Sequence, residues 1–400
     1  MSDGRRSAES QRSAVPAPQP SPVAPDEAIR TGGADDKVIE LDSIGIEVVG
    51  RDSRGRPEQV TIDSRQLFDD GNAAMVEQQF DDALALYRKL LETFPDSRLA
   101  PAARYNSGLA HEGKGEYEAA FAVYRVLAAD KMLDRDAIDA HMRIAAVQAE
   151  LERWADSAAT LRAILGRRDL THADRLEAMA RLGYAYLEQT DYGAAESVLR
   201  DAIDYYRRLT TALDSNYFIA MSYYYLAQVA HRRFHALPVR LPEEQVKSDL
   251  ATKAERVATA YDLYVEALQL HHAYWSTAAG YQMSQIYKEL WEDMVLAPVP
   301  DTITGHARAV YIEEIHRRGR ELLQRAMTGH SKNVELAEAY KTPTVWSDAS
   351  RVRAVEIADI LARETRGELV TPKPRPRTAA ESSGGSPTVG HEYIPVRVDL

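Results

Sequence analysis

The apolar residues in the middle of the chain recur with the spacing of amphipathic helices. An aromatic residue is followed three positions later by a small residue, and four positions further on by an aromatic residue or leucine. Steps of three and four residues return to the same face of a helix, so each triplet marks one buried face. The triplets are Phe80…Ala83…Tyr87, Tyr117…Ala120…Tyr124, Trp154…Ser157…Leu161 and Tyr192…Ala195…Leu199.

These triplets define a repeat, because their first aromatic residues lie 37, 37 and 38 positions apart. A glycine or alanine stands nine positions before each of them. A small residue lets two helices approach closely, and a large side chain beside the crossing fills the remaining space. The sequence therefore predicts a pair of antiparallel helices in each repeat. The predicted packing residues are Gly71, Ala83, Tyr87, Gly108, Ala120, Tyr124, Ala145, Ser157, Gly183 and Ala195.

After residue 210 the repeat is lost, but the helical spacing of apolar residues continues. Prolines interrupt this part of the chain at Pro238, Pro242, Pro298 and Pro300, where they predict loops. We expect longer, irregular helical units that cap the array, since an open repeat end exposes core. The expected helices cover residues 214–236, 243–271, 273–295, 306–340 and 345–365.

The two flanks differ from this helical middle in composition. Together, residues 1–63 and 366–400 hold 11 of the 18 prolines but one of the 21 tyrosines, which predicts disordered tails. Two segments within them have strand-like sequences, a possible short hairpin at 38–62 and the final peptide Tyr393–Leu400. Each is either weakly ordered or adds a strand to a partner's sheet edge. The predicted division is 1–63, four repeats at 64–210, irregular helical units with a cap at 211–365, and 366–400.

Composition narrows the class of protein further. The chain has 400 residues, 45% of them apolar, no cysteine and a net charge of −12. These values exclude wholesale disorder, disulfides and thiolate metal sites, and the acidity argues against nucleic-acid binding. No apolar run is long enough for a transmembrane helix, and no secretory signal is recognisable near Met1. We expect a cytoplasmic protein, or a periplasmic or cell-envelope protein if the start is truncated.

The sequence contains few candidate residues for metal binding or catalysis. His231 and His235 are one helical turn apart, but Arg232 and Arg233 lie between them, so we expect a surface or packing role and no metal site. Glycine-rich phosphate loops are missing, and the many carboxylates look like solvated helix faces. We therefore expect no enzyme, no catalytic residue and no cofactor. An enzyme built on helices 214–340 is the alternative, and it would require a closed polar pocket.

The repeat resembles the tetratricopeptide repeat (TPR) family, whose small, small, aromatic and closing proline positions are matched by Gly71, Ala83, Tyr87 and Pro95. The resemblance implies an all-α, right-handed solenoid of antiparallel helix pairs that binds a protein or peptide in a groove lined by the first helices. Such a groove would suit an apolar or basic helix or an extended peptide. The alternative is that Tyr105 and Tyr184 pack between units. The groove positions are Arg65, Phe68, Asn72, Tyr105, Leu109, Met142, Tyr184 and Leu187.

A narrower resemblance covers the stretch from Phe234 to Pro300, which is similar to cell-envelope TPR proteins of myxobacterial type, including components associated with gliding motility. It implies a structural role in a multiprotein envelope complex. The predicted function is a non-enzymatic scaffold or adaptor that binds protein partners in an envelope or motility-type assembly. A cytoplasmic TPR adaptor or regulatory protein is the alternative.

Overall fold

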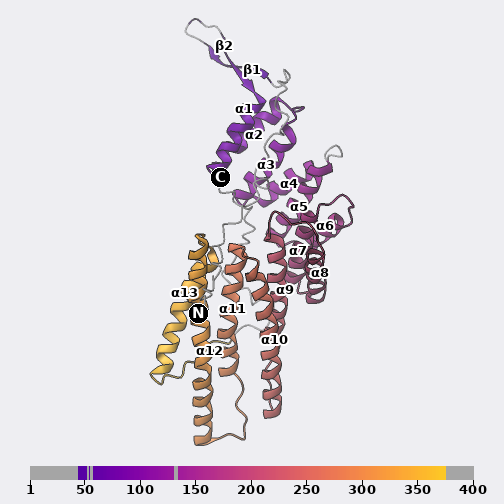
Figure 1. Cartoon of the computed structure of the whole chain (residues 1–400). Coiled ribbons are helices and arrows are strands. Elements are labelled where there is room, and N and C mark those ends of the chain that lie inside the picture. Colours follow the sequence, from indigo (N-terminus) through magenta and orange to yellow (C-terminus); the bar gives the residue numbers. More distant parts are fainter. Residues whose placement is uncertain (1–43, 52–53, 55–56, 130–133, 375–400) are drawn as a thin grey trace, which may run out of the picture.

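The computed structural model describes residues 44–51, 54, 57–129 and 134–374, which form a hairpin followed by helices (Figure 1). Eight helices form antiparallel pairs that stack one after another along the first part of the chain. They are α1 (Ser64–Val76), α2 (Phe80–Thr93), α3 (Ala100–Gly113), α4 (Tyr117–Ala128), α5 (Asp134–Glu150), α6 (Trp154–Leu165), α7 (His172–Glu188) and α8 (Tyr192–Arg207).

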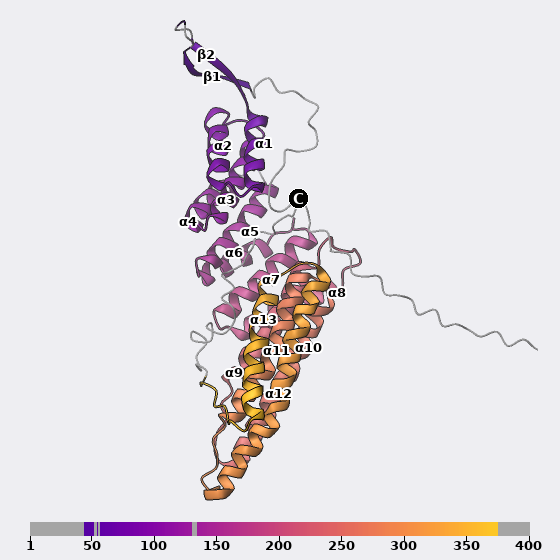
Figure 2. The same ribbon diagram turned by 90° about the vertical axis from the view of Figure 1, so that its left-hand side faces the viewer.

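Five longer helices complete the described chain and run side by side as a bundle (Figure 2). They lie close to the bounds predicted after residue 210, and the proline-containing segments between them form the expected loops. The prediction of an all-α solenoid of antiparallel helix pairs with elongated C-terminal helices is confirmed. The five are α9 (Tyr217–Ala236), α10 (Glu243–Gln269), α11 (Ala273–Val295), α12 (Gly305–Tyr340) and α13 (Val345–Thr365).

Polar side chains fix where several helices begin. Asp63 caps α1, because its carboxylate accepts a hydrogen bond from the Arg65 amide at 2.8 Å. Thr171 and Asp174 form a reciprocal capping box at the start of α7, and Thr344 forms another with Ser347 at α13. Each cap satisfies backbone donors that have no partner inside the helix.

Within a pair, the two helices meet where the sequence has a small residue. A Cβ atom placed on Gly71 would lie 2.5 Å from the ring of Tyr87, and one on Gly108 would lie 2.4 Å from that of Tyr124. Gly183 stands in the same relation to Leu199 in the fourth pair. In the third pair, which has alanine at this position, the Ser157 hydroxyl donates to the Ala145 carbonyl at 2.7 Å. The small residue therefore sets the distance between the paired helices.

An aromatic cluster forms the core where the repeats join the bundle. Trp275 of α11 contacts the rings of Tyr217, Tyr224 and Tyr225 from α9, with centroids 5.2 to 5.7 Å apart. Trp346 of α13 also contacts the Tyr224 ring, with centroids 6.3 Å apart. Helices from three units thus share one core, which is why α9, α11 and α13 do not separate into simple pairs.

One end of α12 extends away from its neighbours. This helix has 36 residues, whereas α11 before it has 23. Residues 304–310, at its start, are exposed on every side. The middle of the helix is different, since Leu323 and Ala326 are fully buried against α11 and α13.

Two strands precede the first helix pair. They are β1 (Ile44–Arg51) and β2 (Pro57–Asp63), which pair antiparallel with an irregularity between Val48 and Gly50. The strand-like peptide Tyr393–Leu400 and most of both predicted tails lie outside the described residues. Among those that are described, no helix is both long and apolar enough to cross a membrane.

Replacing Gly108 with alanine tests the helix contact. Alanine normally favours a helix over glycine by about 1 kcal/mol, but the added methyl would collide with the buried Tyr124 ring. We expect Gly108→Ala to lower the free energy of unfolding by about 1–3 kcal/mol in urea denaturation. Gly193→Ala is the matched control, because its new Cβ would have an ordinary contact at 3.7 Å. Equal stability of the two variants would contradict the proposed helix contact.

Candidate partner-binding site

The residues predicted to line a groove on the first helices are mostly buried within the array. Tyr105 packs against the Tyr124 ring in an edge-on arrangement, with centroids 5.7 Å apart. Tyr184 is half-buried and stacks on Tyr225 at 4.4 Å. The Tyr184 contact joins two units, as in the packing alternative, whereas the Tyr105 contact lies within the second repeat. The buried members of the predicted set are Phe68, Tyr105, Leu109, Met142 and Leu187.

Polar members of the predicted groove also make contacts inside the array. The Asn72 side-chain oxygen accepts hydrogen bonds from Tyr87 at 2.7 Å and from Asn106 at 2.8 Å. Arg65 pairs with Asp69 on its own helix at 3.0 Å, but its side chain is 43% exposed. Apart from Arg65, the first helices therefore leave little of the predicted set for a partner.

A buried ion pair joins the second repeat to the third. Arg143 of α5 donates to Glu112 of α3 through both Nε and a terminal nitrogen, the Nε contact measuring 3.0 Å. The Tyr124 hydroxyl donates to the same carboxylate at 2.6 Å. All three side chains are buried. Since buried charges need partners, this cluster holds the first helices in a defined register.

Glu150 lies near this cluster and titrates in an unusual range. Burial, together with the negative charge of Glu112, raises the pKa of Glu150 to about 8. Arg143 and Arg181 act in the opposite direction but do not offset these effects. The carboxyl group is therefore protonated in the folded protein at pH values where an exposed glutamate is ionised.

Two further ion pairs connect the repeats to the bundle. Arg232 of α9 donates to Glu188 of α7 at 2.5 Å, and Arg233 pairs with Glu196 of α8. Adjacent arginines of one helix thus bind both helices of the fourth repeat. They stabilise the junction where the regular array ends.

A groove lies elsewhere in the array, between α2 and α4, which are the second helices of the first two repeats. Residues of α3 also line it. Its volume is about 550 Å³. We call it the α2–α4 groove. It combines apolar side chains with charged ones, as ligand-binding clefts do. Its lining residues are Asp81, Leu84, Ala85, Arg88, Leu91, Glu92, Arg104, Ser107, His111, Val123 and Val126.

The charges of the α2–α4 groove are only partly neutralised. Asp81 pairs with Lys114 at 2.7 Å, and His111 contacts Glu116 at 2.7 Å. By contrast, the side chains of Arg88 and Arg104 form no ion pair with any residue that the structure describes. The groove therefore offers two arginines to a partner.

Sequence reasoning did not find this groove because it considered only the first helices. Leu84 and Leu91, which are seven residues apart, share the outward side of α2. Val123 and Val126, which are three residues apart, share the outward side of α4. Apolar residues on the outward side of the second helices were the available signal. Their convergence depends on how α2 and α4 are placed around α3, which a single helix pattern does not contain.

Comparison with known proteins supports the repeat assignment. The family model of the tetratricopeptide repeat matches residues 68–134, which include α2, α3, α4 and the whole α2–α4 groove. This segment consists of tetratricopeptide repeats. The fold of these repeats is typically a non-enzymatic interaction scaffold. No curated protein matches the chain in sequence.

Solved TPR structures are similar over much of the chain, at low identity. A tetratricopeptide repeat protein from Parabacteroides merdae is 11% identical, with a TM-score of 0.36, over 74% of this chain and 98% of its own. A TPR repeats protein from Bacteroides fragilis is 16% identical, with a TM-score of 0.27, over 57% and 97%. The P58(IPK) TPR domain is 13% identical, with a TM-score of 0.27, over 76% and 99%.

Removing one member of the buried ion pair tests its structural role. Glu112→Ala leaves the Arg143 charge buried without its carboxylate, and we expect it to cost about 3–5 kcal/mol of unfolding free energy. Glu118→Ala is the control, since it breaks the exposed Glu118–Arg153 pair between the same two repeats and should cost less than about 1 kcal/mol. Urea denaturation followed by circular dichroism measures both. Similar losses in the two variants would contradict a special role for Glu112.

The raised pKa of Glu150 predicts a pH dependence of stability. The protonated form of Glu150 contributes to the free energy of unfolding. This contribution is fully present below the unfolded-state pKa of 4.5 and is lost as the pH rises through the folded-state pKa of about 8. Glu150→Gln keeps the side chain neutral, so it should match the wild type at pH 4 and exceed it by more than about 1 kcal/mol at pH 9. Urea denaturation at both pH values checks this, with exposed Glu152→Gln as control. A constant difference between variant and wild type would refute it.

Proposed function

We propose that this protein is a non-enzymatic scaffold that binds a protein partner in the α2–α4 groove. The observation that carries the proposal is the combination, inside the matched repeats, of a groove of about 550 Å³ with partly exposed apolar residues and two arginines. TPR repeats generally mediate protein–protein interaction. The partner segment expected here is an apolar helix face or extended peptide that also carries carboxylates.

The arginines support the acidic part of this description. Arg88 comes from α2 and Arg104 from α3, so they reach the groove from two different helices. Arginine binds carboxylates through paired hydrogen bonds, which gives direction as well as affinity. A partner carboxylate would supply the counter-charge that neighbouring described residues do not.

The apolar lining of the α2–α4 groove supports the apolar part of the expected partner segment. Leu84, Leu91 and Val123 are half-buried, whereas Val126 is 62% exposed at the groove. Covering such side chains removes apolar surface from water, and interfaces are strongest where this occurs around a few central residues. The groove volume suits a few partner side chains rather than a whole domain.

The cellular setting is the finer part of the proposal. The resemblance of residues 234–300 to envelope TPR proteins supports an envelope or motility-type assembly. A cytoplasmic adaptor or regulator is the alternative. Affinity capture from separated membrane and soluble fractions of the native cells distinguishes the two, because the partner should be recovered from one fraction.

A single substitution in the groove tests the binding site. Val126→Glu places a negative charge among the apolar residues and beside the expected partner carboxylates. We expect it to reduce recovery of the specific partner at least tenfold in quantitative affinity capture with the full chain, without changing the melting temperature. The reason is that Val126 is exposed in the free protein, so its replacement does not alter the core.

Val355→Glu provides the matched control. Val355 is 70% exposed on α13, outside the groove, so the same chemical change should leave partner recovery unchanged. If both variants lose the partner equally, or if neither does, the α2–α4 groove is not the binding site. If the wild type retains no partner over the control resin, the scaffold function itself is contradicted.

A further inference from the structure

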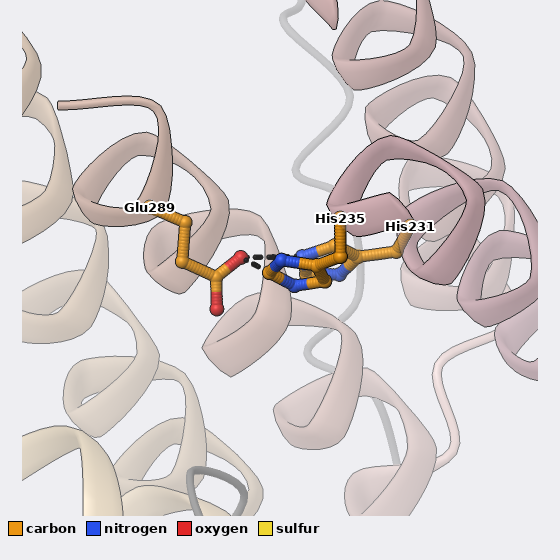
Figure 3. Close-up of side chains that lie close together, drawn as sticks. All are labelled: His231, His235 and Glu289. Atoms are coloured by element: carbon orange, nitrogen blue, oxygen red, sulfur yellow. Dashed lines mark hydrogen bonds and ion pairs between the residues drawn. The ribbon is translucent and has the colours of Figure 1, made fainter. Parts of the chain in front are cut away.

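Two histidines of α9 and one glutamate of α11 converge in the bundle. The Nε2 atoms of His231 and His235 lie 2.6 and 3.1 Å from the same Glu289 oxygen, Oε2 (Figure 3). One helical turn separates the histidines, and their rings stack with centroids 4.9 Å apart. Each of the three residues offers one potential ligand atom, and these three atoms all lie within 4.8 Å of one another.

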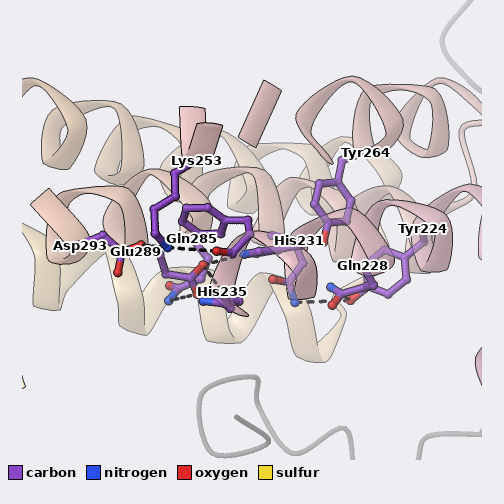
Figure 4. A network of polar contacts seen from close by, with 11 residues as sticks. Tyr224, Gln228, His231, His235, Lys253, Tyr264, Gln285, Glu289 and Asp293 are labelled. Carbon is purple, nitrogen blue, oxygen red and sulfur yellow. Dashed lines mark hydrogen bonds and ion pairs between the residues drawn. The ribbon is translucent and has the colours of Figure 1, made fainter. Parts of the chain in front are cut away.

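The two buried members of this cluster are held in orientation from behind. The Tyr264 hydroxyl of α10 lies 3.1 Å from His231 Nδ1, the ring nitrogen that faces away from Glu289 (Figure 4). Gln285 donates to the other Glu289 oxygen, Oε1, at 3.1 Å. Metal-binding histidines and carboxylates commonly have such outer hydrogen bonds, which direct the remaining donor atom at the ion.

Neighbouring positive charges are compensated by other groups. Arg232 and Arg233, which stand between the histidines in sequence, pair with glutamates of α7 and α8. Lys253 is buried close by, where it binds Asp293 at 2.9 Å and the Phe234 carbonyl at 3.0 Å. The sequence-based argument against a cation at this site therefore does not hold, because both arginines are engaged with carboxylates of other helices.

We propose that His231, His235 and Glu289 bind a zinc ion through Nε2, Nε2 and Oε2. Two histidines and a glutamate form a ligand set that zinc prefers, with metal–ligand distances of about 2.0–2.2 Å. Tetrahedral coordination at that distance separates ligand atoms by about 3.4 Å. The 2.6 and 3.1 Å contacts would each open by less than about 1 Å.

Such an ion would join α9 to α11, two helices that are also linked through the aromatic cluster. The His235 side chain is 29% exposed, so the fourth coordination position is accessible on its side. A water molecule or a donor atom of a partner would complete the coordination there. This zinc site is independent of the α2–α4 groove, which lies in the repeats.

Zinc titration of the full chain tests the proposal. The tag-free protein, treated with EDTA and dialysed, is titrated with Zn²⁺ by calorimetry, and Co²⁺ is used as a visible-absorption probe. We expect one ion per chain, a d–d absorption band typical of tetrahedral Co²⁺, and a melting temperature raised by about 3 °C or more with excess zinc. His235→Gln and Glu289→Gln should each weaken binding at least tenfold.

His172→Gln is the matched control. His172 is exposed at the start of α7 and contacts the Tyr205 hydroxyl, and among the described residues it does not belong to the group formed by His231, His235 and Glu289. Its substitution should leave the zinc affinity unchanged. Circular dichroism checks that each variant is folded. If the wild type binds no stoichiometric zinc, or if folded His235→Gln and Glu289→Gln bind as tightly as wild type, the proposal is wrong.

Discussion

The structure depends on the close contact between the two helices of each repeat. Where Gly71, Gly108 and Gly183 stand, a single added methyl group would enter the side chain of the paired helix. The ring or leucine at that point is fully buried, so it has no free direction in which to move. The distance between the paired helices follows from this contact. A repeat array transmits such local geometry along its length, because each unit contacts its neighbours.

Much of the fold could be predicted from local sequence. The helix faces were visible as three- and four-residue spacings, and prolines marked the loops after α9 and α11. Glycine at the crossing points was recognisable because it recurred at a constant distance before the aromatic residue. What local patterns did not contain was the contact between distant residues. Glu112 meets Arg143 from 31 positions away, and Glu289 meets His231 from 58 away.

The candidate sites illustrate the same limit. Tyr105 and Tyr184 on the first helices were expected either to face a partner or to pack between units, and Tyr105 contacts Tyr124 while Tyr184 contacts Tyr225. An apolar side chain on a helix can face a ligand or the next repeat, and the spacing is identical in both cases. The α2–α4 groove arises because Val126 and Leu84 come from different helices that leave α3 partly uncovered. That arrangement depends on the repeat-to-repeat rotation, which the sequence pattern of one unit does not specify.

The exposed beginning of α12 affects which parts of the molecule unfold locally. Residues 304–310 have water on every side, so this part of the helix is held by its own backbone hydrogen bonds alone. The packed part of α12 already supplies the helix nucleus, but each residue added to an unpacked helix end gains little free energy, so such an end frays readily. Amide protons there will exchange with solvent long before those around Leu323, where the same helix is buried. One continuous helix thus contains a segment that opens independently and a segment that opens only with the bundle.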